Sequence, residues 1–326
     1  MVQTDIEKYG LLRRVVRRAG IGKALFRVKV FRATGVQATL KKACAKHALL
    51  PRIFQARPIS SHSGLEVHML LNHQRVSEGA WCLYSFAHFL ANPCRFIIHS
   101  DGSLNELDSK SLKLLFPGLR IVTRSEADTR VSEELVRRRL TRCMELRQSF
   151  IFSLKVFDPY LYSESEYFIM LDSDILTYRH PRLIVDLARD GKCFFSEDNG
   201  DNACISRLEF EQLAGRPPSA NCNSGLLGVA KPAVNFDIIE RWLESSNFWP
   251  NKKPSYYAEQ TIWSLLMTKN RAKCLGQGYD ICSPFPDYED TICGHYCGGG
   301  YWSTLFYWRG LPFLAKRFIE GGVMPI

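Results

Sequence analysis

Tyr167-Phe168-Ile169-Met170-Leu171-Asp172-Ser173-Asp174 is an apolar run that ends in two carboxylates separated by one residue. Such an uninterrupted apolar run is typical of a strand that is buried on both faces of a mostly parallel sheet. In open α/β sheets, ligands bind beyond the carboxyl ends of the strands, so Asp172 and Asp174 are placed to meet a ligand. Mg²⁺ and Mn²⁺ prefer carboxylate oxygens and often bridge them to substrate phosphates. The stretch predicts a metal-diphosphate site, and a solvated turn is the alternative because Asp and Ser are turn formers.

Length and composition indicate an enzyme-sized globular protein. The chain has 326 residues, of which 46% are hydrophobic, enough for one large α/β domain or two smaller ones. Its 11 cysteines form no C-x-x-C pair, a pattern that suits reduced thiols in a cytosolic protein better than a disulfide framework. Because the sequence contains neither an 18-residue apolar run nor a leader-like N-terminus, we expect no membrane span and no secretion signal.

The positive charge is concentrated in residues 1–60. This segment holds 14 lysines and arginines against Asp5 and Glu7, a local charge of +12, while the whole chain carries +10. Residues 11–18, LLRRVVRR, predict a basic amphipathic helix. Such a helix can lie on an anionic membrane surface, pack against the enzyme with its arginines solvated, or bind nucleic acid, although no aromatic-rich nucleic-acid motif accompanies it. We therefore expect a basic, largely helical extension over residues 1–60.

The rest of the chain alternates between strand and helix patterns. Strands are expected at residues 67–71, 95–99, 119–122 and 167–171, a helix at 78–90, and largely helical structure over 132–158. This alternation predicts right-handed βαβ units and a Rossmann-like, mostly parallel central sheet flanked by helices. No glycine-rich phosphate loop follows the first strand, which argues against a classical dinucleotide fold and a P-loop nucleotidase. If phosphate is bound without such a loop, a metal ion has to neutralise it.

Three further segments carry residues suited to a sugar or metal site. Asn223-Ser224-Gly225 precedes an apolar strand, and the side-chain amide of Asn223 can donate hydrogen bonds to sugar hydroxyls and accept hydrogen bonds from them. An ordinary turn at the start of a strand has the same composition and is the alternative. Glu259 and Gln260 begin a predicted helix, where an acid also favours the helix dipole. His295 lies three residues before Gly298, in a segment that is either a metal-ligand loop or a glycine turn between core aromatics.

Over residues 65–310, these segments in this order resemble the GT-A glycosyltransferases, most closely glycosyltransferase family 8, the group of glycogenin and the lipopolysaccharide galactosyltransferases. The matching motifs are Leu171-Asp172-Ser173-Asp174, Asn223-Ser224-Gly225, Glu259-Gln260, His295-x-x-Gly298 and the lysine-containing segment 153–157. Two positions depart from the family pattern. Glu259 replaces the family's aspartate, and the family's Lys-Pro-Trp ending is reduced to Tyr301-Trp302, which leaves Arg309 as a substitute for the missing lysine.

The resemblance implies a GT-A fold and a set of site residues. Asp172, Asp174 and His295 would ligate Mn²⁺ or Mg²⁺, and the ion would hold the diphosphate of a nucleotide sugar, most often a UDP-sugar. Asn223, Glu259 and Gln260 would act at the donor sugar as the catalytic group. The residues expected to contact the metal or the nucleotide sugar are Asn72, Asp101, Lys155, Asp172, Ser173, Asp174, Asn223 and Gly298. The donor half would span about 61–180 of a domain over 61–326, and the half that binds the acceptor and completes the metal site about 181–310.

The implied activity is that of a hexosyltransferase which moves a sugar from a nucleotide-diphosphate sugar to a glycan or lipid-linked acceptor. The resemblance implies retention, by front-side attack of the acceptor, with Glu259 as nucleophile or base as the alternative. A cytoplasmic location follows, with peripheral contact of residues 1–30 to the inner face of the plasma membrane. Two other classes stay open: a nucleotidyltransferase of the nucleotide-sugar pyrophosphorylase type, and an inactive scaffold that binds anionic surfaces through its N-terminus.

Overall fold

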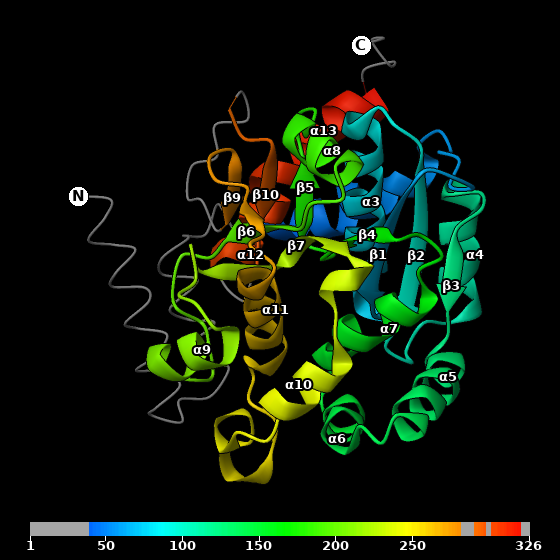
Figure 1. Cartoon of the computed structure of the whole chain (residues 1–326). Helices are drawn as coiled ribbons and strands as arrows, with labels where there is room; N and C mark the ends of the chain where they lie inside the picture. Colours follow the sequence, from blue (N-terminus) through cyan, green and yellow to red (C-terminus); the bar gives the residue numbers. More distant parts are fainter. Residues whose placement is uncertain (1–38, 282–289, 298–300, 321–326) are drawn as a thin grey trace.

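A computed structural model describes residues 39–281, 290–297 and 301–320 (Figure 1). Its centre is a seven-stranded sheet in the order β3-β2-β1-β4-β7-β6-β8, and a small sheet has the order β5-β10-β9. The strands of the central sheet are β1 Leu65–Leu71, β2 Cys94–Ser100, β3 Arg120–Val122, β4 Tyr167–Leu171, β6 Phe194–Glu197, β7 Cys222–Ala230 and β8 Lys273–Cys274. Those of the small sheet are β5 Ile175–Thr177, β9 Tyr279–Ile281 and β10 Cys293–His295.

Helices cover both faces of the central sheet (Figure 1). They are α3 Val76–Leu90, α4 Glu106–Leu115, α5 Arg124–Arg137, α6 Thr141–Ser149, α7 Leu154–Tyr162, α8 Arg182–Arg189, α9 Arg207–Ala214, α10 Phe236–Trp242, α11 Ala258–Lys269, α12 Tyr301–Leu305 and α13 Leu311–Ala315. The predicted α/β class, with a mostly parallel sheet flanked by helices, is confirmed. Among the described residues, every helix is too short or too polar to cross a membrane.

The continuous apolar run of β4 is explained by the two cores that flank the sheet. Ile169 and Leu171 belong to the core shared with α3, α4 and α13, whereas Phe168 and Met170 belong to the core shared with α7, α10 and α11. Because successive side chains of a strand point to opposite faces, a strand between two cores needs apolar residues at every position.

The direction of the strands determines which segments meet at the edge where β4 ends. Strands β3, β2, β1 and β4 pair in parallel, whereas β7 runs antiparallel to β4 and to β6. The carboxyl ends of β1 and β4 therefore lie beside the beginning of β7, so that residues just after Leu171 face residues near Cys222. The candidate functional residues lie along this edge of the central sheet.

Residues 132–158 are largely helical, as predicted, but they do not form one continuous helix. The chain there forms α5, α6 and α7, separated by two breaks. Arg139 has a φ of 58°, in the left-handed region, and ends the run after α5. Phe150 is extended, with a φ of −137°, and ends α6. The second break lets α7 start in a new direction, with Lys155 in its first turn.

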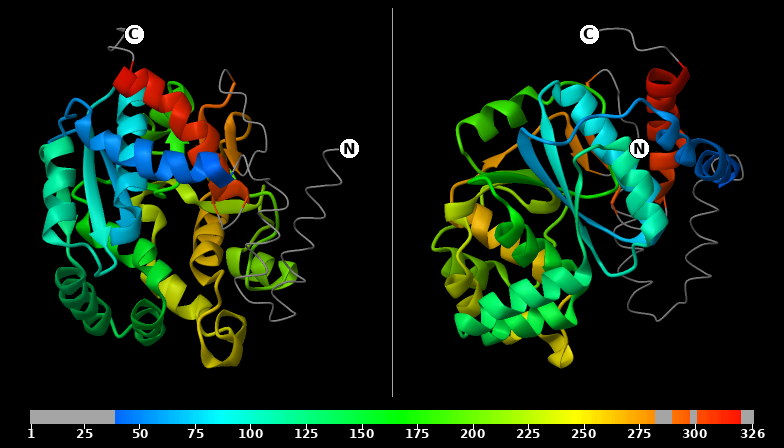
Figure 2. Two further views of the ribbon diagram at one scale, coloured as in Figure 1. Left: turned by 180° about the vertical axis from the view of Figure 1, so that it is seen from behind. Right: turned by 90° about the vertical axis from the view of Figure 1, so that its right-hand side faces the viewer.

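The described part of the predicted extension packs against the main domain. The short helical segments Ala45–Leu49 and Leu50–Gln55 lie beside the C-terminal helices and α3 (Figure 2). Ile53 is fully buried, and the Trp81 indole donates a hydrogen bond to the Leu50 carbonyl over 2.9 Å. Residues 45–55 are thus part of the folded core, while the predicted amphipathic helix at residues 11–18 lies outside the described residues.

Candidate active site

The end of β4 and the beginning of β7 form the centre of the site. Leu171 pairs with Leu226, and the amide of Asp172 donates to the carbonyl of Gly225 over 2.8 Å. This antiparallel register places the sequence Asn223-Ser224-Gly225 directly beside Asp172-Ser173-Asp174. Two motifs about fifty residues apart in the sequence therefore share one sheet edge.

The small sheet brings His295 to the same two aspartates. His295 pairs with Ile175 in the β10/β5 ladder, and the amide of Tyr296 donates to the Asp174 carbonyl over 3.0 Å. His295 Nε2 lies 3.1 Å from Asp174 Oδ1 and 4.0 Å from Asp172 Oδ2. One ligand atom from each of the three side chains lies within 4.8 Å of the others. Two carboxylates and an imidazole at this spacing fit a single Mn²⁺ or Mg²⁺ ion.

His295 and Asp174 stabilise each other's charged form across their 3.1 Å contact. Burial disfavours the protonated His295, but the nearby Cys297 and the two aspartates outweigh it and raise the pKa of His295. Burial disfavours the ionised Asp174, but His295 and the more distant Arg75 outweigh it and lower the pKa of that carboxyl. Without a metal, the pair is therefore a hydrogen-bonded imidazolium and carboxylate. A metal that binds here has to displace the proton from His295.

Gly225 leaves the space that the imidazole occupies. A Cβ at this position would lie 2.3 Å from His295 Cε1 and 2.8 Å from its Nδ1. Real Cβ atoms do not approach other heavy atoms this closely, so any other residue would displace the ring. The glycine of the Asn-Ser-Gly motif is therefore explained by contact with the candidate metal ligand rather than by a turn.

Lys155 connects the metal site to Glu259. Its Nζ lies 2.9 Å from Asp172 Oδ1 and 3.3 Å from Glu259 Oε1, and the Ser224 hydroxyl donates to Glu259 Oε2 over 2.9 Å. The side chains of Lys155 and Glu259 are buried, with exposures of 5% and 7%. Burial disfavours the lysine's charge, but the two carboxylates outweigh it and raise the pKa of Lys155. The ammonium is therefore a permanent charge beside Asp172.

A second polar cluster is centred on Asp198, which the sequence analysis missed. Asp198 Oδ2 accepts hydrogen bonds from Asn223 Nδ2 over 3.1 Å and from Gln260 Nε2 over 3.0 Å. The other end of the Asn223 amide accepts from the amide of Gly225 over 2.9 Å. Asp198 directly follows β6, so it repeats the pattern of Asp172 at the end of β4. The signal in the sequence is the short run Cys193-Phe194-Phe195, followed by Ser196 and the two acids Glu197 and Asp198.

The remaining predicted residues lie at the same edge or outside the described residues. Asn72 follows β1, and its Oδ1 is buried without a hydrogen-bond partner in the described part of the chain. Asp101 follows β2, but its carboxylate accepts from the amide and the hydroxyl of Ser103, so it is engaged in its own turn. Ser173 lies between the two aspartates and is half-buried. Gly298 lies outside the described residues.

A shallow, open hollow adjoins Gln260. It lies between α9, the beginning of β7 and α11. Polar and apolar side chains line it in similar numbers: Asp201, Asn202, Ala203, Ile205, Arg207, Phe210, Pro218, Ala220, Asn221, Cys222, Gln260, Thr261 and Ser264. Amides, hydroxyls and a carboxylate around such a hollow suit a polyhydroxylated ligand.

Comparisons with known proteins give only remote likenesses. No protein-family model matches the chain, and no curated protein sequence matches it. The apo structure of mouse xyloside xylosyltransferase 1 aligns with 10% identity over 73% of this chain and 97% of that chain, with a TM-score of 0.46. The galactosyltransferase LgtC, in complex with donor and acceptor sugar analogues, aligns with 13% identity over 76% of this chain and 100% of its own, with a TM-score of 0.44. The bifunctional glycosyltransferase WbbM covers 77% of this chain and 50% of its own, with 10% identity and a TM-score of 0.48. At these sequence identities and TM-scores, the function has to be inferred from the residues of the site.

Proposed function

We propose that the chain is a metal-dependent glycosyltransferase of the GT-A type, a hexosyltransferase that moves a sugar from a UDP-sugar to a glycan or lipid-linked acceptor with retention. The observation that carries the proposal is the meeting of Asp172, Asp174 and His295, which come from two sheets and whose ligand atoms lie within 4.8 Å of one another. A solvated turn gives no reason for a buried histidine to converge on both aspartates. The neighbouring amides and acids supply groups that recognise sugar hydroxyls.

Asp172, Asp174 and His295 would hold the metal, which when bound neutralises charge on the departing diphosphate. The contacts of Lys155 indicate two roles for its ammonium group. It fixes the carboxylate of Asp172 through a 2.9 Å ion pair, and it adds a positive charge beneath the donor. The hydrogen-bonded pair of Asn223 and Gln260 on Asp198 would orient the donor sugar, with the adjoining hollow on the acceptor side.

The contacts of Glu259 bear on the stereochemical course. One of its carboxylate oxygens accepts from Ser224, and the other lies 3.3 Å from Lys155. Oε1 accepts no hydrogen bond, so it is restrained only by the charge of Lys155. A carboxylate held by a hydroxyl on one oxygen and by an ammonium ion pair on the other is poorly prepared to attack an anomeric carbon. This favours a positioning role for Glu259, which holds Lys155, and supports front-side attack of the acceptor hydroxyl rather than a glycosyl-enzyme intermediate.

The proposal is tested by isothermal titration of the full chain with UDP, in the presence and absence of Mn²⁺. We expect binding that depends on Mn²⁺ and is lost in Asp172→Asn. Asp190→Asn is the matched control, because Asp190 is an exposed acid that pairs with Lys192 over 3.1 Å at the end of α8. If the folded wild type binds UDP under neither condition, the proposal of a UDP-sugar enzyme is wrong. Binding that is equally strong without metal would refute metal dependence.

We further propose that the chain works at the cytoplasmic face of the membrane, held there by residues 1–30. Because residues 45–55 are part of the core, the test is a deletion of residues 1–38 rather than of the whole basic segment. The full chain should bind vesicles of phosphatidylserine and phosphatidylcholine, and the deleted chain should not, while both bind UDP and Mn²⁺ equally. Equal vesicle binding by the two chains would contradict the proposal.

A further inference from the structure

Helix α3 packs against the site and begins at its edge. Its Cys82 thiol donates to the carbonyl oxygen of Asp172 over 3.2 Å. Arg75 is the residue immediately before α3, and its backbone is not helical, with a φ of −114°. It lies four residues beyond the end of β1 and seven residues before Cys82, so it is roughly 10 Å from Cys82 toward the start of the helix. Since α3 starts where β1 ends, Arg75 lies toward the open side of the sheet edge, where the ligand of Asp172 and Asp174 would bind.

Arg75 is half-buried, and its guanidinium has no hydrogen-bond or ion-pair partner among the described residues. The nearest acid on its own helix, Glu78, is buried and accepts a hydrogen bond from the Tyr307 hydroxyl. The positive charge of Arg75 contributes, after the larger effect of His295, to lowering the pKa of the Asp174 carboxyl. Together with burial and Lys46, it lowers the pKa of Lys42. A metal ion held by Asp174 would compete for that carboxylate's charge, so Arg75 would then be available to a further anion.

The charges of the site residues leave a bound diphosphate only partly neutralised. Two aspartates balance a divalent ion, and Lys155 is already shared between Asp172 and Glu259. A bound diphosphate would add at least two negative charges that none of these groups neutralises. The lysine that the family resemblance supplies near the C-terminus is absent here. Its first substitute, Arg309, lies over the Trp308 ring, 5.2 Å from the centroid.

We propose that Arg75 is a diphosphate-binding residue, whose guanidinium holds the phosphate oxygens from the α3 side of the metal site. The inference rests on the proposed function and assigns the cation that the leaving group needs. Guanidinium binds phosphate bidentately and is always protonated, which suits a leaving group that gains charge. Asn72, three residues earlier, has a buried and unpartnered Oδ1 at the same strand end.

In the transfer step, the anomeric C–O bond breaks and both of its electrons pass to the bridging oxygen of the diphosphate. The acceptor oxygen forms the new bond to the anomeric carbon, and its proton passes to the departing diphosphate. Arg75 remains protonated throughout. It stabilises the negative charge that builds up on the leaving group, so it contributes most when the bond is nearly broken.

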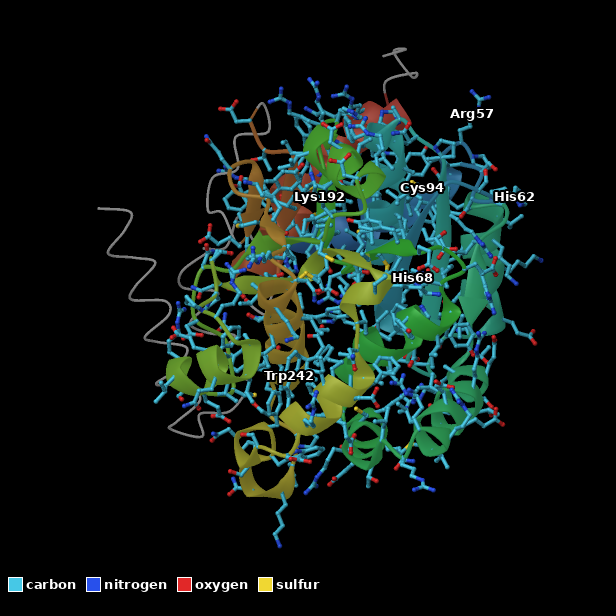
Figure 3. The ribbon with its side chains drawn as sticks, in the orientation of Figure 1. Arg57, His62, His68, Cys94, Lys192 and Trp242 are labelled. Atoms are coloured by element: carbon cyan, nitrogen blue, oxygen red, sulfur yellow. The ribbon has the colours of Figure 1, made fainter. Side chains whose placement is uncertain are left out.

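The test compares Arg75→Gln and Arg75→Lys with Arg57→Gln as the control. Arg57 is exposed and is labelled at the periphery of the molecule in Figure 3. The probes are UDP, UMP, uridine and inorganic pyrophosphate, each titrated with Mn²⁺ present. Charged hydrogen bonds of this kind are worth about 10- to 100-fold in affinity. We expect the affinity of Arg75→Gln for UDP and for pyrophosphate to fall by that factor, and its affinity for uridine to change little. Its affinity for Mn²⁺ alone should equal that of the wild type. Arg75→Lys should recover part of the loss.

Two results would overturn the inference. The first is that, in the presence of Mn²⁺, Arg75→Gln binds both UDP and pyrophosphate as tightly as the wild type does. The other is an equal loss for UDP and uridine, which would assign Arg75 to the base or to the fold. If the wild type binds pyrophosphate but not UDP, the choice of uridine nucleotide fails while pyrophosphate still tests Arg75. If the wild type binds neither, the proposed function and the role of Arg75 both fail.

Discussion

Replacing Gly225 with alanine should disable the metal site while leaving the fold in place. The added Cβ would lie 2.3 Å from His295 Cε1, whereas ordinary contacts begin at 3.4 Å, so the ring has to move by about 1 Å. Metal ligands tolerate deviations of only about 0.2 Å. Gly225 does not have a left-handed φ, so the effect arises from this contact and not from backbone strain. We expect Mn²⁺ affinity to fall by at least about 10- to 100-fold, as it does when groups that orient a ligand are lost.

The assay is titration of Mn²⁺ into each variant, with thermal unfolding measured in parallel. Overpacking typically costs about 1–3 kcal/mol, so Gly225→Ala should remain folded with a lower Tm. Gly200→Ala is the matched control, because a Cβ at Gly200 meets nothing within 4 Å and the backbone there is also not left-handed. A Gly225→Ala protein that binds Mn²⁺ as tightly as the wild type would refute the assignment of His295 as a ligand.

Three further predictions follow from buried groups. Glu259→Gln removes a negative charge that holds Lys155 in place. Steady-state kinetics should show a lower kcat for sugar transfer, while titration with Mn²⁺ should show an unchanged affinity. An unchanged kcat would contradict the positioning role of Glu259. Burial lowers the pKa of His68 and His99, so below about pH 6.5 the unfolded chain takes up protons that the folded chain excludes. His295 and Asp158, whose pKa values are raised, oppose this change, so urea denaturation of the wild type is compared with that of His99→Asn. The wild type should lose more stability than His99→Asn between pH 7.5 and pH 5.5, by up to about 1.4 kcal/mol per pH unit, and an equal pH dependence of the two proteins would be the opposite result. Ile53→Ala should cost about 2–5 kcal/mol in urea denaturation if residues 45–55 belong to the core, and a loss below 0.5 kcal/mol would place them outside it.

The parts of the fold that depend on local pattern could be predicted from the sequence. The apolar run before Asp172 marks a strand between two cores, and the alternation of strands and helices marks the α/β class. The division of residues 132–158 into several helices could not be predicted. It depends on a left-handed Arg139, a conformation that arginine seldom adopts and that no sequence pattern signals.

The site could be predicted where adjacent residues carry the chemistry, but not where distant segments meet. Asp172 and Asp174 stand in one motif. Their contacts with His295 and Lys155 depend on the antiparallel register of β10 and on the direction of α7, which are set by tertiary packing. Asp198 follows a strand of only four residues, too short to stand out by periodicity.

The most direct test of the account is an anomalous difference map from crystals grown with MnCl₂ and UDP. We predict one manganese peak within coordination distance of Asp172, Asp174 and His295, in contact with the diphosphate of the nucleotide. Bound UDP with no manganese between these three side chains, or manganese held elsewhere on the chain, would contradict the account.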